Sequence, residues 1–179
     1  MSGFRVRHPA LGTVALLIVA ALVVILIVSQ LVGSGSGGPT IDGIPCERGE
    51  RLTYHLHAHL ALFVEGEQIE VPPNIGIKGG CIYWLHTHDD SGIIHVEAPS
   101  PRQFTLGEFF SIWGQALSST ALLDRQADNA HQIQAFVNSQ LFEGDPADIP
   151  LESHTLIVVE YGPPFPPPPP FQFPQGLPR

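Results

Sequence analysis

An uncharged apolar run over residues 10–32 limits what the first part of this chain can become. As a helix, the run is long enough to cross the roughly 30 Å hydrocarbon layer of a membrane. A helix in water is rarely apolar on every face. Arg5 and Arg7 precede the run and the next charge is Asp42, so the positive-inside rule places residues 1–9 in the cytoplasm. The sequence predicts a single-pass plasma-membrane protein whose C-terminal part lies on the extracytoplasmic side.

A cleaved signal peptide is the alternative interpretation of this run. Its apolar stretch exceeds the usual core of about 7 to 15 residues, and no clear small-x-small cleavage site closes it. We therefore favour a signal anchor, a transmembrane helix that stays attached.

The rest of the chain divides by composition into three parts. Residues 33–40 form a flexible Gly/Ser linker, and residues 41–162 are of the size expected for one domain. Residues 163–179 are rich in proline, which favours polyproline II conformation over a place in a sheet. We expect a disordered tail that acts as a spacer. The alternative is a ligand for a protein partner that the sequence does not identify.

The charge balance excludes one large class of partners. Lys and Arg total 8 against 17 Asp and Glu, and the formal net charge is −9. Such a surface repels a phosphate backbone, so the sequence predicts no nucleic-acid binding. Cations are the small partners that this surface favours.

The domain is predicted to be mainly β, a single small antiparallel β domain of the β-rich α+β class with one or two short helices. Thr105 and Glu108 have the spacing of a capping box before an apolar helical stretch that ends at Gly114. Runs with strand signals bounded by turn residues predict strands over residues 53–64, 68–71, 81–88, 93–97, 132–137 and 155–161.

The chain has two cysteines, Cys46 and Cys81. In an oxidising extracytoplasmic compartment a disulfide is their default state. The alternative is a pair of thiolate metal ligands. Cys81 has the opposite strand parity to His86 and His88, which favours the disulfide.

Histidines are concentrated in two short segments. His55, His57 and His59 alternate, so on a strand their side chains project from one face. In the second segment, a turn centred on residues 90–91 places His86 opposite His95 and His88 opposite Ile93. A shift of the turn by one residue would move His95 to the other face.

The sequence therefore predicts a transition-metal site that binds Zn(II) or Cu(II) through imidazoles. The candidate ligands are His55, His57, His59, His86, His88 and His95, and the candidate carboxylates that orient them are Asp89, Asp90 and Glu97. His154 stays open as a further ligand. The only methionine is Met1, which makes a blue copper centre improbable.

Three segments resemble an uncharacterised group of prokaryotic membrane-anchored or secreted proteins. They are HLHAH at residues 55–59, CIYWLHTHDDSGIIHVE at residues 81–97 and FTLGEFFSIWGQ at residues 104–115. The resemblance covers most of residues 41–161 and implies family membership without implying an activity.

Three functions remain open at this point. The first is non-enzymatic metal binding on the extracytoplasmic side, which we favour. The second is a metal-dependent enzyme in which Glu97 or Asp90 serves as general base for a metal-bound water. The third is a structural or interaction protein that binds no metal, in which the histidines are solvated surface residues or respond to pH.

Overall fold

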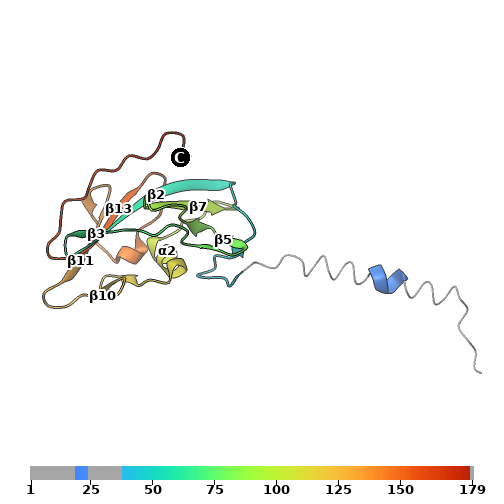
Figure 1. Ribbon diagram of the computed structural model, residues 1–179, viewed down its shortest axis with the longest axis horizontal. Helices are drawn as coiled ribbons and strands as arrows, with labels where there is room; N and C mark the ends of the chain where they lie inside the picture. The colour runs from blue at the N-terminus through green and yellow to red at the C-terminus, as the bar shows by residue number, and fades with distance from the viewer. Residues whose placement is uncertain (1–18, 24–37, 178–179) are drawn as a thin grey trace, which may run out of the picture. The chain divides into compact units, whose positions relative to one another are not determined.

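A computed structural model describes residues 19–23 and 38–177 of the protein (Figure 1). Its chain divides into two compact units, residues 1–35 and residues 36–179. The predicted cytoplasmic segment lies outside the described residues, as do most of the predicted transmembrane helix and of the linker. Within the described ranges, no helix combines the length and the apolarity that a membrane crossing requires.

The second unit is built on a seven-stranded sheet with the order β12-β11-β13-β2-β7-β6, in which β3 also pairs with β2. Its strands are β2 (Tyr54–Val64), β3 (Glu67–Ile69), β6 (Leu85–His86), β7 (Ile93–Ala98), β11 (Gln132–Val137), β12 (Gln140–Leu141) and β13 (Leu156–Gly162). The prediction of a mainly β domain is confirmed. The sheet is mixed rather than antiparallel, because the two central strands β2 and β13 run parallel. A parallel pair needs a long crossover, which residues 65–155 supply.

Two three-stranded sheets flank this core. One has the order β1-β5-β4 and the other β10-β9-β8. Their strands are β1 (Cys46–Glu47), β4 (Ile77–Lys78), β5 (Cys81–Tyr83), β8 (Leu117–Ser118), β9 (Ala121–Leu122) and β10 (Arg125–Gln126). The strand predicted over residues 81–88 is thus two strands, β5 and β6, which break at Trp84 and join different sheets.

The predicted helix is confirmed as α2 (Leu106–Trp113). The Thr105 hydroxyl accepts a hydrogen bond from the Glu108 N–H, and the Glu108 carboxylate accepts one from the Thr105 N–H, which is the expected capping box. Gly114 ends the helix with φ 79°, a left-handed conformation that glycine adopts without a steric cost. A single 3₁₀ turn, η1 (Pro146–Asp148), is the other helical element among residues 38–177.

Strand alternation gives the seven-stranded sheet two different faces. Leu56, Ala58, Leu60 and Leu62 of β2 point into the main core together with the buried side chains of α2. The opposite parity of β2 carries the histidines and then Ala61 and Phe63, which pack with Val158 in a smaller cluster. We call this second side the histidine face. The predicted split between core-facing and histidine-bearing positions is confirmed.

The proline-rich tail lies back along β13 and β2 on the histidine face. The tail begins directly after β13, and its Phe171 ring stacks on His59 with ring centroids 3.5 Å apart. His59 pairs with Leu156 at the other end of β13, so the tail retraces the length of that strand. Every third position between 165 and 171 is exposed and the two between are partly buried, which matches the three-residue period of polyproline II.

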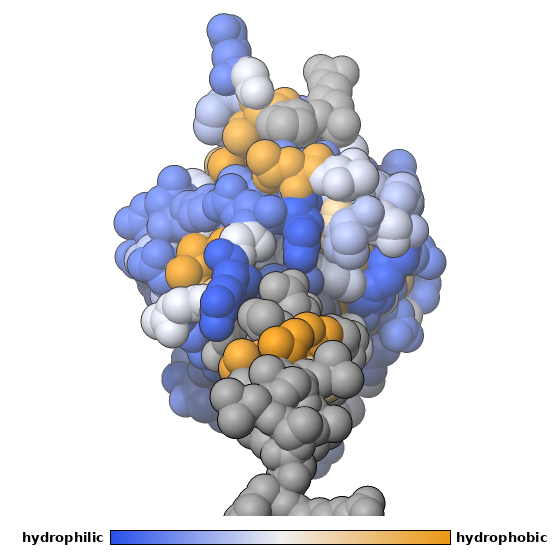
Figure 2. Space-filling model, turned by 90° about the vertical axis from the view of Figure 1, so that its right-hand side faces the viewer, coloured by the Kyte–Doolittle hydropathy of each residue, from blue (hydrophilic) through white to orange (hydrophobic). Residues whose placement is uncertain are grey.

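This arrangement differs from the expected disordered spacer. Phe173 also stacks, with its ring centroid 4.3 Å from that of His154. The physical reason is that aromatic rings interrupt the prolines, and a polyproline helix with apolar side chains can cover an apolar surface without donating hydrogen bonds. In residues 38–177 the exposed large hydrophobic side chains are Leu52 and Leu141, and the surface seen in Figure 2 is mostly hydrophilic.

Glu160 of β13 is fully buried on the histidine face, and neither of its carboxylate oxygens has a hydrogen-bond partner among residues 19–23 and 38–177. It pairs with Phe63 in the register of β13 and β2, beside the cluster of Ala61, Phe63 and Val158. Burial raises its pKa to about 7. Proline has no N–H to donate, so the proline-rich tail on this face offers few hydrogen bonds to the Glu160 carboxylate.

We expect Glu160→Gln to stabilise the domain at alkaline pH. The pKa of Glu160 is raised in the folded state, so ionisation of its carboxyl destabilises the fold. This destabilisation is absent below the unfolded-state pKa of about 4.5 and grows as pH rises towards 7. The variant should gain about 2 kcal/mol over wild type between about pH 5 and about pH 8. Urea unfolding in the presence of a chelator measures the free energy of unfolding of both proteins at each pH. The pH-dependent contribution of the buried histidines is the same in both and cancels in the difference. A difference that does not change with pH would contradict the prediction.

Candidate metal centre

Strand pairing brings histidines from three strands into one row on the histidine face. His57 of β2 lies opposite His95 of β7, and His95 lies opposite His86 of β6. One step along, His55 lies opposite Glu97. The predicted register of His86 with His95 is confirmed. Four imidazoles and one carboxylate thus come from three adjacent strands.

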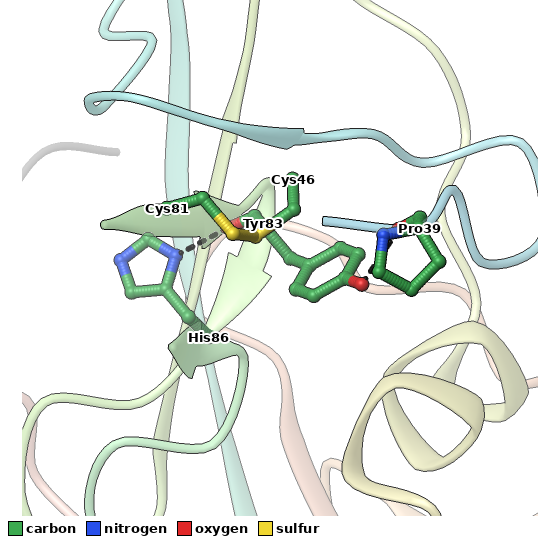
Figure 3. Close-up of a disulfide and its surroundings, with 5 residues drawn as sticks. All are labelled: Pro39, Cys46, Cys81, Tyr83 and His86. Atoms are coloured by element: carbon green, nitrogen blue, oxygen red, sulfur yellow. Dashed lines mark hydrogen bonds between the residues drawn. A yellow bond between two sulfur atoms is a disulfide. The ribbon is translucent and has the colours of Figure 1, made fainter. Parts of the chain in front are cut away.

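The backbone carbonyl of Tyr83, the last residue of β5, orients the His86 imidazole. Its Nδ1 lies 2.9 Å from the carbonyl oxygen of Tyr83, to which it donates (Figure 3). Tyr83 is held in turn, since its hydroxyl donates to the carbonyl of Pro39 at 2.7 Å. Figure 3 also shows the Cys46–Cys81 disulfide beside this pair, which confirms the predicted bond. A donating Nδ1 leaves Nε2 as the ligand atom, an orientation typical of metal-binding histidines.

Three buried polar atoms at this position have no hydrogen-bond partner among the described residues. They are His86 Nε2, His95 Nδ1 and Glu97 Oε2. The other oxygen of the carboxylate, Glu97 Oε1, lies 3.9 Å from His86 Nε2 and 3.7 Å from His95 Nδ1. Buried polar atoms without a partner are rare and costly, and a metal ion between these atoms would satisfy them together.

His88 completes a first group of possible ligands. One ligand atom each from His86, His88, His95 and Glu97 lies within 4.8 Å of all the others. His88 was expected opposite Ile93, but β6 ends at His86, so His88 lies in the following loop with 43% of its side chain exposed. Its Nε2 lies 3.6 Å from Glu50 Oε1, a carboxylate that we did not predict near the site.

A second group consists of His55, His57 and His95, whose ligand atoms also lie within 4.8 Å of one another. His55 Nε2 is 3.1 Å from His57 Nε2 and 3.2 Å from Glu97 Oε1. Glu97 therefore contacts both groups. Two ligand atoms on a tetrahedral Zn(II) lie about 3.3 Å apart, because each is about 2.0 Å from the ion.

The protonation states suit a metal ion. Burial lowers the pKa of His86 to about 4, so its imidazole is neutral at physiological pH. Burial acts to raise the pKa of Glu97, but the nearby imidazoles of His95, His86 and His55 outweigh this, and the pKa is lowered. Neutral imidazoles and an ionised carboxylate are the forms that bind metal ions.

The structure separates His59 from the two groups. Its ring stacks on Phe171 of the tail, and burial lowers its pKa to about 4. His59 and Asp90 instead line a cavity of about 310 Å³ that none of the grouped residues lines. His154 lies with Phe173 and outside both groups.

Of the three predicted carboxylates, Glu97 is the one that the structure places among the imidazoles. Asp89 accepts hydrogen bonds from the N–H and the hydroxyl of Ser91, and these bonds lower its pKa. Asp89 thus shapes the loop before β7, the role of a turn residue that the sequence also allowed.

The resemblance to prokaryotic membrane-anchored or secreted proteins stays a prediction. No protein-family model, no curated protein and no solved structure matches this chain.

Proposed function

We propose that this protein binds a transition-metal ion, Zn(II) or Cu(II), through His86, His95 and Glu97, with His88 as a fourth ligand. The observation that carries the proposal is that ligand atoms of these four residues converge, and that His86, His95 and Glu97 each have a buried polar atom with no hydrogen-bond partner in the part of the chain that the structure describes. Histidine and carboxylate form a donor set that suits both metals.

Binding without catalysis is the form of the proposal that the ligand count favours. Four protein ligands fill the coordination of a tetrahedral Zn(II), whereas catalytic zinc sites keep a position for water. The exposed side chain of His88 gives the ion a route from solvent to the buried ligands. The protein would thus capture or hold metal ions.

The proposed place of binding is the extracytoplasmic side of the plasma membrane. Two features support it: the uncharged apolar run over residues 10–32 and the disulfide, which is typical of oxidising compartments. In this proposal the anchored domain binds metal ions that are outside the cytoplasm.

The test measures metal bound to the full chain, purified without a histidine tag and dialysed against Zn(II) or Cu(II). We expect Glu97→Gln, which keeps the side-chain volume, to weaken binding by about 100-fold, and His86→Ala to weaken it at least as much. His131→Ala is the matched control, because this imidazole pairs with Asp128 and lies outside both groups. Circular dichroism checks that each variant is folded. A wild-type chain that retains no metal, or a folded Glu97→Gln variant with unchanged affinity, would refute the proposal.

A further inference from the structure

The histidine face offers more ligands than one ion can use. His55, His57, His86, His88, His95 and Glu97 are six donors in two overlapping groups, while a structural zinc ion takes four. If one ion takes His86, His88, His95 and Glu97, the imidazoles of His55 and His57 remain.

The geometry of the remaining pair is that of a metal site. His55 Nε2 lies 3.1 Å from His57 Nε2 and 3.2 Å from Glu97 Oε1, close to the separation of about 3.3 Å expected for ligands on one tetrahedral ion. His57 is fully buried and Glu97 is nearly so. Their ring and carboxylate positions are therefore set by packing before any ion arrives.

Glu97 belongs to the first group, contacts His55 of the second, and has two oxygens to offer. Oε1 is within 4 Å of His55, His86 and His95, and Oε2 is buried without a hydrogen-bond partner in the described part of the chain. A carboxylate that gives one oxygen to each of two ions is typical of two-metal sites, whose ions lie about 3.5 to 4 Å apart. The negative charge of the carboxylate also offsets part of the repulsion between the two ions.

We infer that the histidine face holds a second divalent transition-metal ion, bound by His55, His57 and Glu97 beside the first. This inference rests on the proposed function, because the first ion shares Glu97. The second ion has three protein ligands, so a water molecule or a small anion takes its fourth position.

Stoichiometry tests the inference with the full chain. We expect two equivalents of Zn(II) per chain in wild type by elemental analysis after dialysis, and one equivalent in His55→Ala. His55 is partly exposed, so its loss leaves the core intact. His59→Ala is the matched control, since His59 lies on the same strand and face but outside both groups, and it should keep two equivalents.

Cu(II) gives an independent readout of proximity. Two Cu(II) ions about 4 Å apart couple magnetically, so wild type loaded with copper should show a coupled or weakened paramagnetic resonance signal. His55→Ala should show the signal of an isolated ion.

The outcomes separate the two proposals. No bound metal refutes the proposed function itself. One equivalent in wild type, unchanged in His55→Ala and lost in His86→Ala, leaves the first site standing and overturns the second. One equivalent that both variants lose shows a single site made from both groups, and also overturns the second ion. Two equivalents in wild type and His59→Ala with one in His55→Ala support it.

Discussion

Reduction of the Cys46–Cys81 disulfide is expected to lower the free energy of unfolding by about 4 kcal/mol. The bond joins residues 35 positions apart, and in the chain-entropy model a closed loop of that length restricts the unfolded chain by about this amount. Both cysteines are buried, so the bond also fixes the small sheet in which β1 pairs with β5. Urea unfolding of the full chain, followed by the fluorescence of Trp84 and Trp113, measures the change.

The control distinguishes the cross-link from the packing of its sulfur atoms. Reduced wild type keeps both sulfur atoms, whereas a Cys46→Ala and Cys81→Ala double variant loses them and should be slightly less stable still. Reduction should also weaken metal binding by about tenfold, because the Tyr83 carbonyl that orients His86 lies in β5. A reduced chain that unfolds within about 1 kcal/mol of the oxidised one would contradict the loop-entropy argument.

Local patterns predicted the parts of the site that depend on chain neighbours. The side-chain alternation of a strand does not depend on its partners, so HLHAH placed its imidazoles on one face wherever β2 was to pair. A turn centred on residues 90–91 fixed His86 opposite His95 for the same reason, since a hairpin register follows from its turn.

Contacts between distant segments could not be predicted from the sequence. No local pattern indicates that β7 pairs with β2 as well as with β6, yet this pairing brings His57 and His55 to His95 and Glu97. At the break the chain changes partner: Tyr83 pairs with Cys46 of β1, whereas the Trp84 carbonyl accepts a hydrogen bond from the Glu97 N–H of β7. Both contacts form only in the folded domain. The approach of Glu50 to His88 likewise joins two loops that are distant in the sequence.

The spacing of the phenylalanines in the tail gives information that the proline content does not. Phe165 and Phe171 are six residues apart, which is two turns of a polyproline II helix, so both rings fall on the same side. A purely solvated spacer has no need of such spacing. The periodicity of the aromatic residues among the prolines therefore predicts a surface for the tail to cover, where the proline content alone predicted a spacer.

Removal of the tail is expected to destabilise the domain by about 3 kcal/mol at about pH 5, by area bookkeeping for the aromatic and apolar surface that it covers. A chain that ends at Gly162 loses Phe165 and Phe171, and with Phe171 it loses the ring that stacks on His59. The matched control ends at Phe173, because residues 174–176 are exposed, and it should unfold like the full chain.

The size of this loss should depend on pH through Glu160. At about pH 5 the buried carboxyl is mostly neutral in the folded state, since its pKa is raised to about 7, and truncation removes apolar contacts without any gain. At about pH 8 the carboxyl is ionised, so truncation also returns a buried charge to water and the net loss should shrink to about 1 kcal/mol. In the Glu160→Gln background the loss should be equal at both pH values. If the chain that ends at Gly162 is as stable as the full chain at about pH 5, the tail does not cover the histidine face in solution. If truncation of the wild-type chain lowers the free energy of unfolding equally at both pH values, the tail does not shield Glu160 from water.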